Sequence, residues 1–449
     1  MAALLGRTTL RQHQAGGATL LMTMGLLLGM SLTLLYLNRS LVFEQRASAN
    51  QVRATLALEL AEAGLEWATG MLNTAHHIDA NCSFAGGSTV SFRRQYVQTD
   101  WGKSSATATD MSIATSSYPG CKIDGNNWAC NCPDISGIGA VATNPGSTPL
   151  PGFSIVFSAT SDPEAVRVLA TGCTALVGAC TPASGGTSDA SATVSAILKL
   201  RRMPRALPGA ALTCGSSCTV GASYNISNQD VASGGLLVNA GSAIKLANGA
   251  SATSIPGQAG ASALLGNDSS LSALSSNDPD CSKSAVFGAF FGSTVSQYAH
   301  SPLSKSLADC GSASTCSALV DAAYAEGWRS FYFPDGFARN GSGVNLGSAE
   351  DPVTLVSGAA FNLDGNLTIY GIIFSNDANA TDTAIGSARI RGALLTCASY
   401  DDNASGALAY DGAVLQALQR STGPLVRVPG SWTDRCRASK DQPPVISCS

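Results

Sequence analysis

The sequence predicts an α+β protein in which one long N-terminal helix is followed by two β-rich regions. An uncharged apolar run covers Ala18 to Leu37, and an amphipathic helical pattern continues from it as far as Asn73. After residue 74, short runs rich in β-branched and apolar residues alternate with Gly, Pro, Ser and Asn, which is typical of strands joined by turns.

The apolar run is the first element. About 20 apolar residues cross the hydrocarbon core of a bilayer as a helix, so residues 18–37 are long enough to span it. The preceding residues 1–16 contain Arg7 and Arg11 and no acidic residue, which places this end in the cytoplasm and the bulk outside. A cleaved secretory signal is the alternative. Its apolar stretch would be shorter and would end at a small-residue cleavage site, whereas Asn38 and Arg39 follow here.

The helix is expected to continue beyond the membrane. Residues 40–73 contain no Pro and only two glycines, and apolar residues recur at helical spacing among charged ones. The apolar positions are Val52, Leu56, Leu60 and Leu65. A helix over residues 17–73 would be roughly 85 Å long at 1.5 Å per residue.

Three N-terminal segments carry a family resemblance. Gln14–Leu21, Glu44–Arg46 and Ala61–Glu66, together with the apolar run, resemble the N-terminus of PilX-type minor pilins. The resemblance implies that residues 1–16 are a leader which prepilin peptidase removes on the cytoplasmic side, cutting after Gly16 or after Gly17. Either cut leaves the membrane helix in the mature protein.

One position departs from the pattern of major pilins. Most pilins carry Glu as the fifth residue after the cut, and here Leu21 (Met22 in the other register) stands there. PilX-type proteins and the K-type pseudopilin of type II secretion also commonly lack this Glu. Within the same span, Gly25 and Gly29 form a GxxxG pair that would let membrane helices pack closely, although this composition alone makes such pairs frequent.

The soluble part is expected to form two regions. Residues 74–204 read as a pilin-like β-rich head, with strands around 153–157, 166–169 and 192–198 and a boundary at Met203-Pro204. Residues 205–449 read as a β-rich C-terminal domain. Its strands of three to five residues, separated by Gly, Asn and Asp, suggest stacking as in a β-solenoid. A β-sandwich remains the alternative, and residues 284–298 and 317–327 are expected to be helical.

Fourteen cysteines and only four histidines favour disulfides in an oxidising compartment over a metal site. No CxxC pair occurs. Close spacing nominates four pairs: Cys173 with Cys180, Cys214 with Cys218, Cys310 with Cys316, and Cys436 with Cys448. The overall connectivity stays open. We expect no metal and no cofactor. Residues 376–382 alternate oxygen-bearing side chains but lack the Gly and Glu of a calcium loop, so a turn is expected.

No catalytic residue is nominated. The sequence has no GxSxG, GxxxxGK[ST] or HExxH motif, and His76-His77 reads as a solvated helix end. The net charge of −4 and the 12% share of charged residues give no general attraction for nucleic acid. We therefore expect a protein that is not an enzyme and does not bind nucleic acid.

The resemblance implies a minor pilin of a type IV pilus that initiates or caps the filament, at its tip. It implies a single-pass inner-membrane protein that later reaches the pilus surface. Its partners would be inner-membrane lipid, prepilin peptidase, the major pilin, other minor pilins and a pilus-tip adhesin. Two alternatives are a surface adhesin or ligand-binding module on a pilin anchor, and the K-type pseudopilin of type II secretion.

Overall fold

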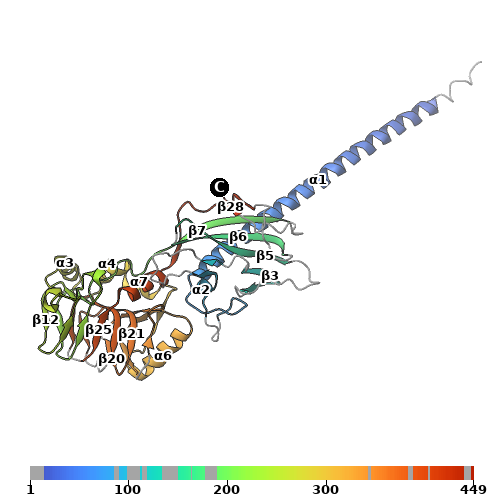
Figure 1. Ribbon diagram of the computed structural model, residues 1–449. Helices are drawn as coiled ribbons and strands as arrows, with labels where there is room; N and C mark the ends of the chain where they lie inside the picture. Colours follow the sequence, from blue (N-terminus) through green and yellow to red (C-terminus); the bar gives the residue numbers. More distant parts are fainter. Residues whose placement is uncertain are drawn as a thin grey trace, which may run out of the picture.

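The computed structural model describes residues 15–84, 90–98, 112–113, 119–133, 150–162, 164–176, 190–341, 345–359, 361–382, 388–402, 405–438 and 446–448. Its first element, α1 (Ala15–Leu72), is one uninterrupted helix that projects far beyond the rest of the chain (Figure 1). The expectation of a long N-terminal helix followed by β-rich structure is confirmed.

The head is built on a six-stranded antiparallel sheet of order β26-β7-β6-β5-β3-β4. Its strands are β3 (Gly120–Asp124), β4 (Asn127–Asn131), β5 (Leu150–Ala159), β6 (Ala165–Leu176), β7 (Ser191–Leu200) and β26 (Leu425–Arg427). The alternate residues Phe153, Ile155 and Phe157 of β5 are buried in one core with Leu65 and Leu72 of α1. The second half of α1 therefore lies on one face of this sheet.

Smaller elements complete the head. These are α2 (Phe92–Tyr96), the two-residue strands β1 (Val97–Gln98) and β2 (Ser112–Ile113), and the terminal pair β27 (Cys436–Ala438) and β28 (Ile446–Cys448). Disulfides brace the region: Cys121–Cys130 joins the neighbouring strands β3 and β4, and Cys82–Cys132 connects the loop after α1 to the end of β4.

Residues 201–424 form a second body, which we call the insert. All of its strand pairings are parallel in the part of the chain described, and they form three rows of stacked short strands. The first row holds β15 (Ser304–Ser306), β16 (Ser330–Phe333), β19 (Val353–Ser357), β8 (Leu212–Cys214), β11 (Val238–Ala240) and β14 (Leu264–Leu265). The second row holds β17 (Phe337–Asn340), β20 (Phe361–Asp364), β22 (Asn379–Asp382), β24 (Ser399–Asp402), β9 (Cys218–Val220) and β12 (Ile244–Leu246). The third row holds β18 (Asn345–Leu346), β25 (Ala407–Tyr410), β10 (Asn225–Ser227) and β13 (Ser251–Thr253).

Two long strands, β21 (Thr368–Ser375) and β23 (Arg389–Thr396), turn the corner between the third row and the first. The corner is made by Gly371 and Gly392, which pair in register and have φ of 143° and 140°. A Cβ on Gly371 would lie 1.8 Å from the carbonyl oxygen of Val353. Glycine is required here because both the backbone angle and the close approach of the next coil exclude a side chain.

The chain enters this stack in its middle. Leu212 pairs with Val238 and Val238 with Leu264, so the first coils repeat every 26 residues towards one end. The chain then crosses to the other end and winds back, and Leu394 finally pairs with Leu212. The last coil thus stacks on the first, and one continuous core fills the interior.

Helices connect and cover the stack. They are α3 (Ser269–Asn277), α4 (Ala285–Phe291), α5 (Val295–Ala299), α6 (Ala313–Ala325) and α7 (Gly412–Ser421), with the short 3-10 turns η1 (Val231–Ser233) and η2 (Gly260–Ala263). In the first row, Leu355 and Ile373 point into the stack, while Val356 and Phe374 point outward against Phe287 of α4. α3, α4 and α7 lie along this outer face (Figure 1).

The chain returns from the insert to the head. After α7, β26 pairs antiparallel with β7, and Thr433 forms a bridge with Ser195. The boundary placed at Met203-Pro204 falls just after β7 ends at Leu200. The extent of 205–449 for the C-terminal domain needs correction, because residues 425–438 belong to the head. The added domain is therefore inserted into the head and is tied to it by two chain crossings.

Candidate functional site: the exposed half of the N-terminal helix

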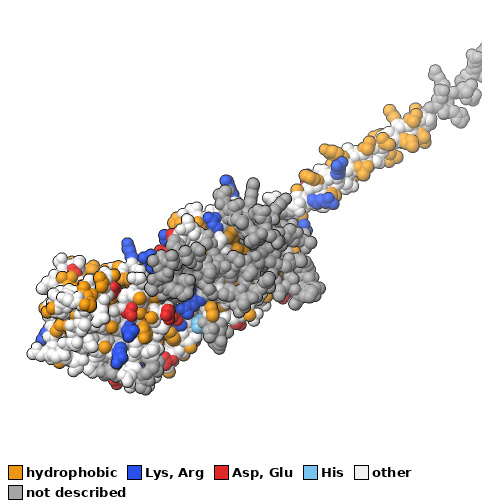
Figure 2. Space-filling view, viewed as in Figure 1, with side chains coloured by type: hydrophobic (Ala, Val, Ile, Leu, Met, Phe, Trp, Pro, Cys, Tyr) orange, Lys and Arg blue, Asp and Glu red, His pale blue; other side chains and the backbone are white. Residues whose placement is uncertain are grey.

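α1 consists of two halves with different surroundings. From Ala18 to Leu56 every residue is exposed, and its apolar side chains, such as Leu21 (72%) and Leu35 (67%), have no contact that would shield them. Residues 17–72 make a helix long and apolar enough to cross a membrane. On the visible face, the space-filling view shows apolar side chains along the projecting segment, with basic side chains nearer the head (Figure 2). A helix that is apolar on all sides needs an apolar medium or other helices around it.

The sequence-nominated positions lie on this half. Gly17 is in the first turns of α1, Gly16 belongs to the same helix, and residues 1–14 of the expected leader lie outside the described residues. Leu21, Gly25 and Gly29 follow at four-residue steps, which places them on one face. No atom of the described chain would lie within 4 Å of a Cβ on Gly25 or Gly29. Close packing at this GxxxG pair thus requires a helix from another molecule.

The second half of α1 is fixed by close contact with the sheet. A Cβ on Gly172 of β6 would lie 2.2 Å from the carbonyl oxygen of Ala57 and 2.4 Å from the amide nitrogen of Ala61. A Cβ on Gly64 of the helix would lie 2.8 Å from the ring of Phe153. Small residues on both elements let the backbones of α1 and β6 approach closely. The sheet therefore holds the second half of α1, from which the first half projects.

The charges of α1 are arranged on two sides. Arg39, Arg46 and Arg53 recur every seven residues and so share one face just beyond the apolar run. On another side, Glu62 accepts a hydrogen bond from the indole nitrogen of Trp432 (2.9 Å), and Glu66 pairs with Arg427 (2.6 Å). The segment that returns from the insert therefore runs beside α1.

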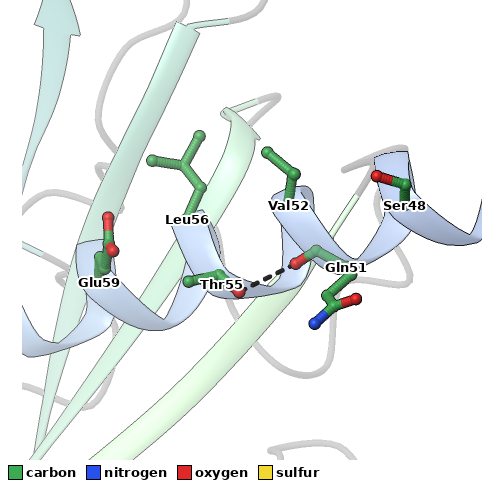
Figure 3. Close-up of a pocket in the computed structure, with 6 residues that line it drawn as sticks. All are labelled: Ser48, Gln51, Val52, Thr55, Leu56 and Glu59. Carbon is green, nitrogen blue, oxygen red and sulfur yellow. Dashed lines mark hydrogen bonds between the residues drawn. The ribbon is translucent and has the colours of Figure 1, made fainter.

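A shallow groove of about 390 Å³ lies beside α1 where the helix meets the head (Figure 3). Its lining residues are Ser48, Gln51, Val52, Thr55, Leu56 and Glu59. The hydroxyl of Thr55 donates to the backbone carbonyl of Gln51 (3.0 Å), and Glu59 is the one ionisable side chain among the six. This set offers neither a nucleophile with a base nor convergent donors for a ligand.

Disulfides form within both the insert and the head. Cys214–Cys218 and Cys310–Cys316 are both disulfides, at the pairs that their spacing nominated. Cys281–Cys397 joins the segment between α3 and α4 to the residue that follows β23. Cys173 is disulfide-bonded, and Cys180, its expected partner, lies outside the described residues. Cys436 is also disulfide-bonded and faces Cys448 across β27 and β28.

Within the described residues, no group of three or more His, Cys, Asp or Glu side chains could hold a metal ion. At the segment considered for calcium, Asp377 accepts a hydrogen bond from the amide of Asn379 (3.0 Å), which forms a local turn leading into β22. The carboxylate is therefore used within the chain itself.

The reading of His76-His77 as a solvated helix end is wrong. The ring of His76 lies between Phe84 (4.7 Å) and Trp328 (4.8 Å), and the amide of His77 donates to the carbonyl of Glu326 (3.0 Å). Burial lowers the pKa of His76, which the charge of Glu326 opposes and that of Lys305 reinforces. Both histidines lie in the contact between the head and the insert, because the loop after α1 reaches the end of α6. No local sequence signal indicated this contact.

Ion pairs strengthen the same contact. Asp351 of the insert accepts from Arg94 of the head (2.7 Å) and from Arg329 of the insert (2.8 Å). The Arg329 guanidinium also lies 3.7 Å from the centre of the Tyr324 ring. The buried Arg93 donates to the carbonyl of Gly423, where the chain leaves the insert (2.8 Å), and burial lowers its pKa to about 10. These contacts hold the insert in one orientation on the head.

Comparison with known protein families, characterised proteins and solved structures finds no match for this chain. The molecule is thus defined by its own architecture: an N-terminal helix able to span a membrane, a head folded on that helix, and a large β-rich insert.

Proposed function

We propose that this protein is a minor pilin of a type IV pilus, anchored in the inner membrane by the exposed half of α1 and placed at the filament tip. The observation that carries the proposal is the continuity of α1. The same unbroken helix is apolar and exposed at its start and is packed on an antiparallel sheet at its end. A subunit built in this way can pass from lipid into a bundle of like helices without refolding.

The insert supports tip placement. It adds residues 201–424 to the head, and the Arg94–Asp351 ion pair and the hydrogen bond from Arg93 to Gly423 hold it beside the sheet. A domain of this size would crowd neighbouring subunits if it were repeated along a helical shaft. We also propose that the insert is a β-solenoid, because parallel stacking in three rows differs from the antiparallel sheets of a β-sandwich.

Leu21 is consistent with the same position. A carboxylate in the apolar helix would be costly unless a partner amine pairs with it. With Leu21 there, this chain offers no carboxylate to a partner amine. It therefore fits a position in the filament where no such pair is needed. The first-assembled end of a filament is such a position.

Two other functions rank lower. A surface adhesin on a pilin anchor is favoured by one observation, the β-rich insert at the end of the molecule opposite the projecting half of α1 (Figure 1). The K-type pseudopilin carries a mostly helical insert with calcium sites. Here the insert is mainly strands, and the carboxylate of Asp377 is used in a local turn. We further propose that the protein is not an enzyme.

The anchoring is tested by fractionating cells with and without prepilin peptidase and comparing the masses of the product. We expect a membrane-bound product that is shorter by the leader when the peptidase is present. A soluble periplasmic product that begins after Leu37 would contradict the proposal.

A further inference from the structure

The two ends of the insert differ in how their terminal strands are covered. At the end near the head, α6 and the loop at Trp328 cover the coil that lies nearest the head. Trp328 is only 7% exposed there. At the opposite end, β12 is the last strand of the second row, with β9 as its only strand partner in the described chain. Stacked-repeat proteins need a cap at each end, because an uncovered coil leaves core side chains and backbone groups without partners. We call the outer side of β12 the open edge.

The backbone of β12 shows which groups lie on the open edge. The amide of Cys218 donates to the carbonyl of Ala243, and the amide of Ala247 donates to the carbonyl of Val220. In a parallel ladder, residues alternate between the two sides of a strand. Ala243, Lys245 and Ala247 thus bond towards β9. The N–H and C=O groups of Ile244 and Leu246 point away from it, to the open edge.

The neighbouring strand at this end is covered, which confines the open edge to β12. In β13, Ser251 bonds inward to Tyr224, and the amide of Asn228 donates to Thr253, so Ala252 points outward. The turn η2 lies over it, since a Cβ on Gly260 would be only 2.4 Å from the carbonyl oxygen of Ala252.

The side chains at the open edge define what fits there. Ile244 and Leu246 point into the stack and are only half-buried, because no further coil of the described chain covers them. Lys245 points outward and is exposed, and it is the only charged residue between Val238 and Asn267. Figure 2 shows few charged side chains at this far end, and Figure 1 places β12 at the end of the molecule opposite the projecting half of α1.

We propose that the open edge of β12 binds an extended segment of another protein, which adds to the row as one more strand. The segment would place an acidic side chain beside Lys245 and apolar side chains on either side of it, over Ile244 and Leu246. Main-chain hydrogen bonds supply affinity in this mode, and alternate side chains supply specificity. A second copy of this chain fits poorly, because two-fold pairing on β12 would bring the two Lys245 side chains together. The inference does not depend on the filament role.

The test uses the detergent-solubilised full chain and a fluorescent peptide with Val-Asp-Val at its centre, measured by anisotropy. We expect saturable binding that is at least tenfold weaker with a Val-Lys-Val peptide. Lys245→Glu should invert this preference, whereas Lys245→Arg should keep it. Arg389→Glu is the matched control, because Arg389 is an exposed cation on a strand that has neighbours on both sides. It should leave binding unchanged.

The backbone contribution is tested separately with Ile244→Pro. This change removes an N–H on the open edge and leaves the bonds to β9 in place, so the insert should remain folded. Unchanged proteolytic resistance checks the fold, and Ile244→Val is the matched control. We expect Ile244→Pro to abolish binding. No saturation at millimolar peptide, equal binding of both peptides, or unchanged binding by Ile244→Pro would each overturn the proposal. Self-association of the full chain that Ile244→Pro removes would overturn it in favour of a second copy.

Discussion

The side chain of Asn73 makes two hydrogen bonds to the backbone of Leu425, 352 residues further along the chain. Its Nδ2 donates to the carbonyl oxygen (2.8 Å), and its Oδ1 accepts from the amide nitrogen (2.7 Å). The side-chain amide of Asn73 thus bonds both backbone groups of Leu425, as a neighbouring strand would. It fixes the end of α1 to the point where the chain re-enters the head. One residue joins the anchor, the head and the insert.

Asn73→Ala should remove both of these bonds. Each half-buried hydrogen bond contributes about 1 kcal/mol, so we expect a loss of about 2 kcal/mol in the local free energy of opening. Hydrogen exchange at the amide of Leu425 should become roughly 30-fold faster. Asn248→Ala, at an exposed turn of the insert, is the control and should not change it. Unchanged exchange at Leu425 in Asn73→Ala would show that the contact does not hold the two segments together.

Gly172→Ala should disturb the seat of α1 on the sheet. The new methyl group would collide with the backbone of Ala57 and Ala61, and overpacking of this kind costs about 1–3 kcal/mol. Thermal unfolding of the purified protein should begin at a lower temperature. Gly209→Ala is the matched control, because a Cβ there meets no atom within 4 Å. Equal unfolding temperatures for the two variants would contradict the close helix–sheet contact.

The contact between head and insert should weaken in mild acid. Burial holds the pKa of His76 below its usual value of 6.5. As pH falls through 6.5, the unfolded or separated state binds the proton first, so the stability that neutral His76 contributes is lost below that pH. Protection factors, which correct hydrogen exchange for the intrinsic effect of pH on amide exchange, should therefore be lower in residues 74–84 and 324–329 at pH 5.5 than at pH 7.5.

His76→Phe should remove this dependence on pH, because the ring contacts with Phe84 and Trp328 can remain without a titrating group. His300→Gln is the control, because the side chain of His300 is exposed. The groups whose charge acts on His76 are Glu326 and Lys305. A pH dependence that persists in His76→Phe would assign the effect to another group.

The disulfides should differ in what they contribute. Cys281–Cys397 closes a loop of 116 residues and Cys310–Cys316 one of six, so loop entropy predicts about 5 and about 2 kcal/mol respectively. Replacing both cysteines of each pair by serine and measuring the urea midpoint of the insert should give that order. Thiol labelling of the denatured, unreduced protein should find few reactive thiols. The reverse order of midpoints would show that native-state packing outweighs loop closure.

The sequence predicted α1 and the long strands well, because their signals are local. The uncharged run of residues 18–37 and the helical spacing of Leu60 and Leu65 need no knowledge of the rest of the chain. The ten-residue strand β7 was recognised from its β-branched core. Strands of only three residues, such as β10, carry too little pattern, and the coils stacked on either side stabilise them.

Contacts between distant segments could not be predicted in this way. The return of β26 to β7 and the bonds of Asn73 to Leu425 depend on how two bodies meet. His76 was read as solvated because its burial comes from Trp328, about 250 residues away by the numbering. The open edge of β12 could not be predicted from the sequence either, because the order in which the strands stack decides which strand lies at an edge.

We propose above that this chain enters a pilus in low copy number with α1 intact. Quantitative mass spectrometry of sheared, washed pili tests it most directly, since it reports both the amount and the first residue of the mature protein. We predict a product that begins at Gly17 or Ala18 and is present at a small fraction of the major pilin. Leu21→Glu should raise its share along the shaft. Absence from the pili, an amount close to that of the major pilin, or a first residue beyond Leu37 would contradict the claim.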